Sequence, residues 1–176
     1  MIRRPASPVT TLIVSAVLMM TPLTPYALEG DAEAPIEVTA NQLDLDDNKG
    51  TAIYTGDVEM EQGSMKLTGD RVEILRNDAG EVTRVTATGN DGRAYIEQQP
   101  AEDEPIVKGW GHTVIYHAAE RRVELYDDAE LHQARDRFNG AFVEYFLDRR
   151  QVQARSEREG SDERERVRMT LNPEQQ

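Results

Sequence analysis

Apolar and polar residues alternate along most of the chain after residue 35. An alternation with period two is typical of half-buried β-strands, whereas an amphipathic helix repeats its apolar residues every three to four positions. No segment has the spacing of a long amphipathic helix, so the pattern predicts an all-β protein. The alternating positions are Ile36/Val38, Leu43/Leu45, Ala52/Tyr54, Val58/Met60, Met65/Leu67, Val72/Ile74, Val123/Leu125, Ala129/Leu131 and Val143/Tyr145/Leu147.

Short runs of turn-forming residues separate these strands at regular intervals. They occupy residues 46–50, 62–64, 77–80 and 89–92. Such spacing is typical of an antiparallel sandwich or jelly roll. An acidic segment with prolines, Gln98 to Pro105, is predicted to be a loop that is too polar to pack.

The sequence also contains an internal repeat. Residues 52–74 align without gaps on residues 123–145, with six identical pairs among the 23 aligned positions. The apolar positions keep the same phase in both copies, so both copies present the same face to the interior. In each copy the phase shifts after a glycine, Gly69 or Gly140, which predicts a bulge or corner there. We therefore expect a single domain, a folded antiparallel sheet made of two like halves.

The first 27 residues differ from the remainder of the chain. Arg3 and Arg4 precede an apolar run, Thr11 to Met20, and Pro22 and Pro25 interrupt any helix before residue 27. This order predicts a secretory signal peptide over residues 1–27, followed by the β-domain over residues 28–173 and a disordered end at residues 174–176. An uncleaved anchor is the alternative, but a bilayer core requires about 20 apolar residues.

Charge and composition exclude several classes of function. The chain has 33 acidic residues against 20 Lys and Arg, a net charge of −13, and its sequence shows no concentrated cationic face. A phosphate backbone needs such a face, so nucleic-acid binding is not expected. The absence of cysteine excludes disulfides, thiolate metal sites and cysteine nucleophiles.

Candidate catalytic groups are sparse. After the predicted signal peptide the only serines are Ser64, Ser156 and Ser161, in a turn and in a charged segment, so a Ser-His-Asp triad is not expected. His112 and His117 are five residues apart and would lie on opposite faces of a strand, which disfavours a shared metal.

A calcium loop is also disfavoured. Asp44, Asp46 and Asn48 have the spacing of half an EF-hand loop, but the glycine comes one position late and the twelfth position is Thr55. A turn rich in Asp and Asn explains these residues better.

The predicted interior contains adaptable and aromatic side chains. They are Tyr54, Met60, Met65, Ile96, Tyr116, Phe138 and Tyr145. Two interpretations are open: an ordinary core, or a slot for acyl chains. After a charged segment over residues 156–166, Val167, Met169 and Leu171 alternate again and predict a final strand.

Several segments together resemble a known family. The first half contains Tyr54-Thr-Gly-Asp-Val58, then Lys66-Leu67-x-Gly-Asp70-Arg71-Val72-Glu-Ile74, and the second half contains Val107–Gly109 through Tyr116, Val123–Leu125 and Phe138–Gly140. Together with Pro35–Val38 and Arg93–Ile96, they resemble the OstA-like family of periplasmic lipopolysaccharide-transport proteins over about residues 31 to 173.

This resemblance implies an open, twisted antiparallel β-jelly roll and a non-enzymatic function without cofactor or metal. Members of the family shelter the acyl chains of lipopolysaccharide in an apolar groove and carry the lipid from the inner to the outer membrane. The residues expected to line such a groove here are Ile36, Val38, Tyr54, Met60, Met65, Leu67, Ile74, Ile96, Tyr116, Leu131, Phe138 and Tyr145.

The resemblance also implies docking through unpaired edge strands. The expected edges are the strand at Ile36 and Val38 and the strand at Val167, Met169 and Leu171. The implied partners are lipopolysaccharide, an LptC-type inner-membrane component, an LptD-type outer-membrane component and further copies of the chain, joined end to end. The sequence has no GxxxxGK loop, so energy for transport has to come from elsewhere.

Two alternative functions remain open at this point. A purely structural assembly module would have a solid interior and would use only its edges. A membrane-tethered LptC-like component would share the fold and retain its N-terminal segment as an anchor.

Overall fold

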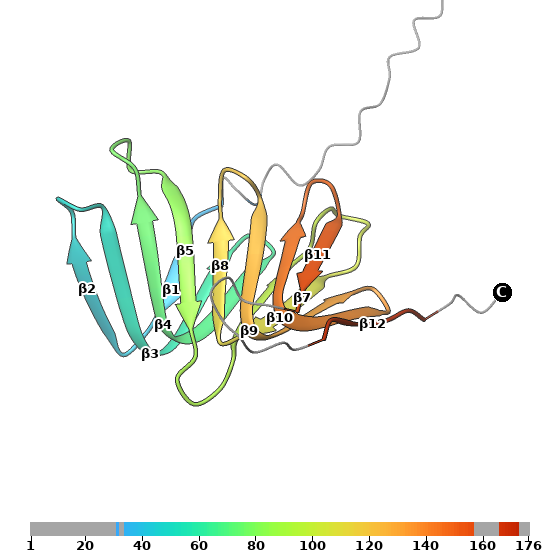
Figure 1. The fold of residues 1–176 in the computed structure, drawn as a ribbon. Helices are drawn as coiled ribbons and strands as arrows, with labels where there is room; N and C mark the ends of the chain where they lie inside the picture. Colours follow the sequence, from blue (N-terminus) through green and yellow to red (C-terminus); the bar gives the residue numbers. More distant parts are fainter. Residues whose placement is uncertain (1–30, 32–33, 157–165, 173–176) are drawn as a thin grey trace, which may run out of the picture.

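Twelve β-strands account for most of the residues that the computed structural model describes, which are 31, 34–156 and 166–172 (Figure 1). All of the strand pairs are antiparallel, which confirms the predicted all-β class. The predicted signal peptide, its anchor alternative and the predicted disordered end at 174–176 lie outside the described residues. The strands are β1 (Glu37–Thr39), β2 (Gln42–Asp46), β3 (Thr51–Gln62), β4 (Met65–Arg76), β5 (Val82–Thr88), β6 (Ala94–Gln98), β7 (Val107–Gly111), β8 (Thr113–His117), β9 (Arg122–Gln133), β10 (Asp136–Phe146), β11 (Gln151–Arg155) and β12 (Arg168–Thr170).

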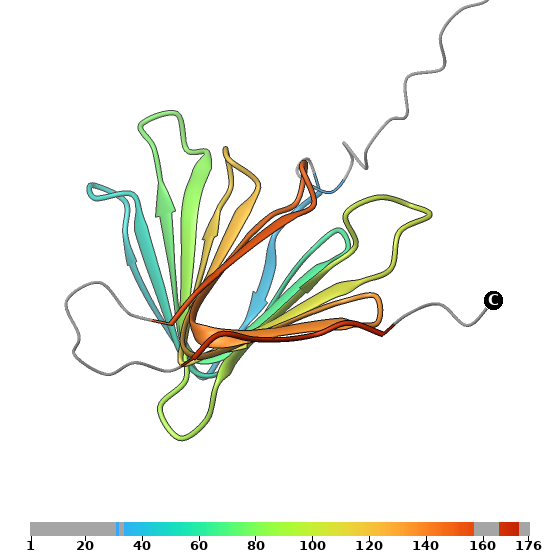
Figure 2. The same cartoon turned by 45° about the vertical axis from the view of Figure 1, so that its right-hand side comes forward.

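One continuous sheet is folded lengthwise into two leaves that diverge like a V (Figure 2). The long strands β3, β4, β9 and β10 pass through both leaves, because each pairs with different neighbours along its two halves. Leaf A contains β2, β5, β8 and β11 together with one half of each long strand. Leaf B contains β1, β6, β7 and β12 together with the other halves.

The long strands bend at two equivalent corners. In β3 the register shifts between Thr55 and Val58, where Gly56 and Asp57 both have positive φ. In β9 the equivalent residues, Asp127 and Asp128, also have positive φ, and the register with β10 shifts next to Gly140. Glycine and aspartate tolerate this left-handed backbone better than most residues. Gly69 in β4 pairs with Val58, directly beside the register shift of the first half. The corners predicted at Gly69 and Gly140 are thus confirmed.

The internal repeat extends beyond the segment found in the sequence. A shift of 71 residues places β2 on β8 and β3 on β9 with identical bounds, and it places β1 within β7. The pairing is repeated as well: Val38 faces Met60 in the first half, and Gly109 faces Leu131 in the second. β4, β5 and β6 likewise correspond to β10, β11 and β12 in order and pairing. Each half is therefore a six-strand unit.

The core lies between the leaves. The inward positions of the central strands are occupied by aliphatic residues that are almost fully buried, such as Leu67, Val72, Val114, Leu125 and Leu131. β-branched and aliphatic side chains fit the pleated, half-buried surface of such strands, which explains why these segments form a sheet.

Three expectations from the sequence need correction. Leu43 and Leu45 are 50% and 55% exposed, not half-buried, because β2 is an edge strand with a neighbour on one side only. Gln98, predicted in a loop too polar to pack, is the last residue of β6 and is buried. The strands β5 and β11 were not expected, since Val82–Thr88 and Gln151–Arg155 have few large apolar residues.

The difference between centre and edge can be tested with one substitution made at two positions. Leu125→Ala opens a cavity in the core, and we expect it to lower the free energy of unfolding by about 3 kcal/mol. The matched control, Leu43→Ala at the exposed edge, should cost less than about 1 kcal/mol. Urea unfolding followed by circular dichroism measures both; equal losses would contradict this assignment of the core.

Candidate functional site

The wide side of the V, where the two leaves are farthest apart, is its mouth. It contains an open cavity between the leaves. Its volume is about 510 Å³, within the range of about 300–1,000 Å³ that is typical of ligand pockets. Leaf B contributes Ala34, Ile36 and Gln62, and leaf A contributes Val82, Thr83, Tyr116, Ala118 and the turn between β4 and β5. The two leaves diverge toward this side (Figure 2).

Elsewhere between the leaves the interior is filled by side chains. A second, apolar cavity at the junction of the two halves measures only about 10 Å³, and its lining residues include Ile96, Val123, Leu131 and Tyr145. Leu131 and Tyr145 are each 1% exposed. The molecule therefore combines a packed interior with an open, partly apolar mouth.

The predicted groove residues fall into two groups. Met60, Met65, Leu67, Ile74, Ile96, Tyr116, Leu131 and Tyr145 are buried in the core between the leaves. Ile36, Val38, Tyr54 and Phe138 are partly buried and pack against that core. The structure thus brings all twelve to the same side of the folded sheet, and Ile36 and Tyr116 both line the cavity at the mouth.

One buried polar group was missed by the sequence analysis. Gln98 is 6% exposed and borders the apolar cavity at the junction, and its Oε1 has no hydrogen-bond partner among the described residues. A buried acceptor without a partner is costly. Its position at the end of an alternating strand carried no signal that distinguished it from a solvent-facing residue.

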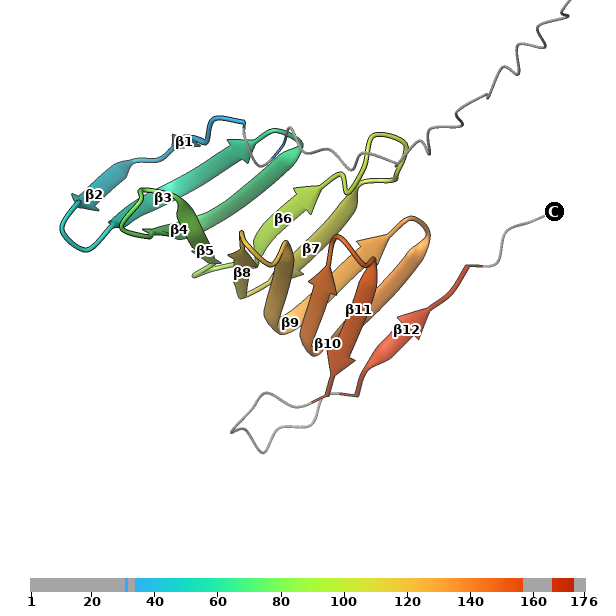
Figure 3. The same ribbon diagram turned by 90° about the horizontal axis from the view of Figure 1, so that it is seen from above.

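The ends of the sheet are the second candidate site. β1 and β2 pair with β3 alone at one end, and β11 and β12 pair with β10 alone at the other (Figure 3). Val38 lies in β1 and Met169 in β12, at the two ends where docking through edge strands was expected. The structure adds β2 and β11, whose inward residues include Leu43 and Leu45.

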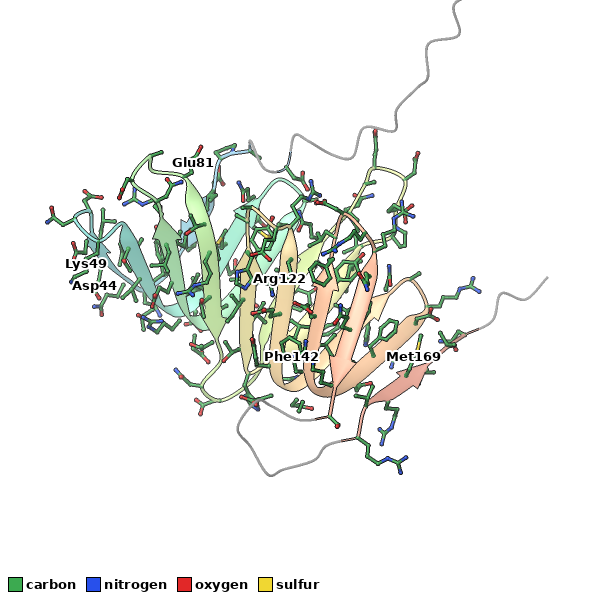
Figure 4. The ribbon with its side chains drawn as sticks, turned by 45° about the horizontal axis from the view of Figure 1, so that its top comes forward. Asp44, Lys49, Glu81, Arg122, Phe142 and Met169 are labelled. Carbon is green, nitrogen blue, oxygen red and sulfur yellow. The ribbon has the colours of Figure 1, made fainter. Side chains whose placement is uncertain are left out.

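A charged network covers the outer face of leaf A. The Arg122 guanidinium donates to Glu120 Oε2 at 2.8 Å and to Glu144 Oε1 at 2.9 Å, and it also contacts Glu124 (Figure 4). His117 Nε2 lies 3.1 Å from Glu124 Oε2. These contacts tie β8, β9 and β10 together on the side away from the core.

This network shifts the pKa values of its members. Burial alone would raise the pKa of Glu124, but hydrogen bonds from His117 and Arg122 outweigh it and hold that pKa below 4.5. Burial would likewise lower the pKa of Arg122, whereas its hydrogen bonds to Glu120 and Glu124 raise it. Both groups are therefore charged at neutral pH.

The described residues do not assemble a metal centre. Nowhere in 31, 34–156 and 166–172 do three or more His, Cys, Asp or Glu side chains lie where they could hold a metal ion. The three histidines are apart: His112 is exposed, His117 pairs with Glu124, and His132 lies 2.6 Å from Glu130. In the turn after β2, Asp46 Oδ1 accepts a hydrogen bond from the backbone N–H of Lys49, so this carboxylate stabilises a turn.

No helix in the described part of the chain combines the length and the apolar character that a membrane crossing requires.

Several known proteins are similar to this chain in sequence and architecture. The family described as "LptA/(LptD N-terminal domain) LPS transport protein" matches residues 37–151. The lipopolysaccharide export system protein LptH of Pseudomonas aeruginosa is 41% identical over 128 residues, which is 73% of this chain and 72% of that protein. The export system protein LptA of Escherichia coli K12 is 27% identical over 164 residues, covering 93% of this chain and 85% of that protein.

A solved structure has the same fold. It is the crystal structure of LptH, described as the LptA-homologous periplasmic component of the conserved lipopolysaccharide transport device of P. aeruginosa. It has a TM-score of 0.74 and 37% sequence identity, and the match covers 82% of this chain and 99% of that one.

The partnerless acceptor of Gln98 leads to a stability prediction. Gln98→Leu removes the buried Oε1, which has no hydrogen-bond partner among the described residues, and we expect it to raise the free energy of unfolding by about 1 kcal/mol in urea titrations. The control Gln98→Glu keeps the shape but places a carboxyl group there, and it should be destabilising. A loss of stability in the leucine variant would show that the amide is satisfied.

The outer network leads to a pH prediction. The lowered pKa of Glu124 contributes stability that is complete above about pH 4.5 and is lost as the pH falls through the folded-state value. We therefore expect the wild-type protein to lose more stability than Glu124→Gln between pH 6 and pH 3, measured by urea unfolding. Equal losses in the two proteins would contradict it.

Proposed function

Because the chain belongs to the LptA/LptH family of lipopolysaccharide-transport proteins, we propose that it is a periplasmic bridge component that holds lipopolysaccharide between its two leaves. The family acts in transport and is not enzymatic. In this proposal the acyl chains enter the apolar side of the folded sheet, and the sugars remain in water. The observation that carries the proposal is the open cavity at the mouth, above a continuous apolar interior.

The physical basis of binding would be apolar burial. Each methylene group that leaves water stabilises a complex by about 0.8 kcal/mol, so even part of an acyl chain provides substantial affinity. The net charge of −13 argues against a broad attraction for lipid phosphates. Met60 and Met65, on the inward face, are flexible enough to adapt to a lipid chain.

Directional transfer would depend on the ends of the sheet. The unpaired backbone groups of β1, β2, β11 and β12 can form hydrogen bonds with a strand of another molecule. An LptC-type component at one end and an LptD-type component at the other, with further copies between them, would join the leaves into one extended apolar surface across the periplasm.

A structural assembly module is the second candidate. The packing of the deep interior favours it, since Leu67, Leu131 and Tyr145 are at most 1% exposed. In that case the edges alone would matter, and the chain would assemble without lipid.

Site-specific photo-crosslinking distinguishes the two candidates. A photoreactive amino acid at Ile36, which lines the mouth, should form adducts with lipopolysaccharide in cells that export it. The neighbouring position Glu37 is exposed on the opposite side of β1 and is the matched control, because successive strand residues face opposite ways. Mass spectrometry identifies the adducts.

Lipopolysaccharide on Ile36 but not on Glu37 would support the carrier. Adducts of Ile36 with protein partners only would favour the structural module. As a second test, Phe138→Asp places a charge on a partly buried inward residue without removing the centre of the core. We expect it to reduce lipid adducts at Ile36 while circular dichroism remains β-like; undiminished adducts would remove Phe138 from the groove.

A further inference from the structure

The side chain of Gln98 places a polar group inside the apolar face of leaf B. Gln98 is the last residue of β6 and is 6% exposed, and its Oε1 has no hydrogen-bond partner among the described residues. Such a buried acceptor has lost its hydrogen bonds to water without gaining others, which destabilises the folded state. Buried polar atoms of this kind are rare in folded proteins, and a functional role is one of the reasons for which they are retained.

The residues around this acceptor do not supply the missing donor. Gln98 borders the apolar cavity at the junction of the two halves, and the aliphatic residues that line this cavity with it include Ile96, Val107, Val123 and Leu131. The hydroxyl of Tyr145, another lining residue, accepts a hydrogen bond from Gln133 Nε2 at 3.4 Å and is not a partner of Gln98 Oε1. The cavity measures about 10 Å³, which is no more than the smallest space that holds a water molecule.

The fold itself does not require a glutamine at this position. β6 of the first half corresponds to β12 of the second, and Ile96 and Met169 are equivalent because they pair with equivalent residues of β4 and β10. Two positions further along, Gln98 is therefore equivalent to Leu171. The other half of the molecule thus has an apolar side chain at the same inward position, as strand alternation favours.

The cavity that Gln98 borders is next to the open cavity at the mouth. Tyr116 lines the cavity at the mouth, and Val123 lines the cavity at the junction. These two residues are direct strand partners in leaf A. A lipid chain that enters at the mouth and extends toward the second half therefore comes next to Gln98.

Gln98 is also level with the mouth and not with the bend. One position before it, Glu97 pairs with Lys66 of β4. Met65 is therefore level with Gln98, and it pairs in turn with Gln62, which lines the mouth. A group of the ligand that reaches Gln98 has to lie close to the water outside the V.

We propose that Gln98 selects acyl chains that carry a hydroxyl group near their head end, by accepting a hydrogen bond from that hydroxyl. This inference rests on the proposed function as a lipid carrier and specifies the chemistry of the chain that is held. A hydroxylated chain supplies the donor that Gln98 Oε1 lacks, whereas a plain methylene chain leaves the acceptor unpaired.

The level of Gln98 determines where on the chain the hydroxyl has to be. In the proposed complex the head group stays in water at the mouth, and the apolar end of the chain extends toward the bend. Because Gln98 is level with Gln62 of the mouth, the hydroxyl has to be on one of the first carbon atoms after the head group.

Binding also requires the leaves to separate at the junction, since a cavity of about 10 Å³ does not accept an acyl chain. In the described part of the chain the leaves are joined through the long strands β3, β4, β9 and β10, which bend on the side opposite the mouth (Figure 2). The leaves can therefore move apart at the mouth without breaking strand pairs.

Selectivity of this kind follows from the difference between an apolar contact and a hydrogen bond. An apolar pocket discriminates weakly between a plain chain and one with an added hydroxyl, whereas a buried polar group strongly favours the ligand that pairs with it. The net contribution of one hydrogen bond between neutral groups corresponds to about five- to tenfold in affinity.

Three related fatty acids test the inference on the full chain. Tetradecanoic acid has no donor on its chain, β-hydroxytetradecanoic acid has one near its head, and β-methoxytetradecanoic acid has the same oxygen atom but cannot donate. We expect the hydroxy acid to bind about five- to tenfold more tightly than the other two. Displacement of a fluorescent fatty acid, below the concentration at which micelles form, measures the three affinities.

Two substitutions at Gln98 should remove this preference. Gln98→Leu takes away the acceptor and introduces the side chain that is present at the equivalent Leu171, so the hydroxy acid should bind no more tightly than the plain acid. Gln98→Met keeps an unbranched side chain of similar length without the amide and should behave in the same way.

Gln62→Leu is the matched control. Gln62 lines the mouth as well, but its Nε2 donates a hydrogen bond to the Ala34 carbonyl oxygen at 3.2 Å. This substitution should change the affinity for all three acids alike and should leave the ratio between the hydroxy acid and the plain acid as it is in the wild-type protein.

Several results would overturn the inference. The wild-type protein could bind the hydroxy acid no more tightly than the plain or the methoxy acid, or the preference could persist in Gln98→Leu and Gln98→Met. Both results leave the carrier function standing, because acyl chains still bind. If none of the acids binds, the inference fails as well, and the lipopolysaccharide adducts at Ile36 decide the carrier function by themselves.

Discussion

The structure depends on four long strands that belong to both leaves at once. β3, β4, β9 and β10 each bend near the middle, and each half of such a strand pairs with different neighbours. Because each long strand runs through both leaves, its covalent backbone and its hydrogen bonds to neighbouring strands hold the leaves together at the bend. The apolar faces of the leaves are thereby directed toward each other, which creates the core and leaves the far side of the V open.

An open, folded sheet has two consequences that bear on function. Its mouth does not close, so apolar residues such as Ile36 and Tyr116 border a cavity that water and ligands can reach. Its ends do not close either, so four strands retain unpaired backbone groups. A closed barrel would have no unpaired edge strands, so docking by strand pairing would then have no surface to use.

Periodicity predicted the strand class and the inward phase well. Val72, Leu125 and Leu131 were expected inside and are buried, and the glycines at the phase shift were expected at corners and are found there. Local pattern was less informative for β5 and β11, whose outward residues are polar and whose inward residues are small. It also placed Leu43 and Leu45 inside, because alternation shows which face a residue is on but not whether another strand or the opposite leaf covers that face.

The sequence by itself determined the strand pattern, the two-fold repeat, the position of the corners and, through family resemblance, the kind of protein. These properties follow from local chemistry: side-chain alternation, backbone preferences at glycine and aspartate, and motif order. Only the tertiary structure decided which strands end the sheet, and that the Oε1 of Gln98 is buried without a hydrogen-bond partner among the described residues. Those properties depend on which distant segments become neighbours, and strand pairing across the chain is not encoded in any short segment.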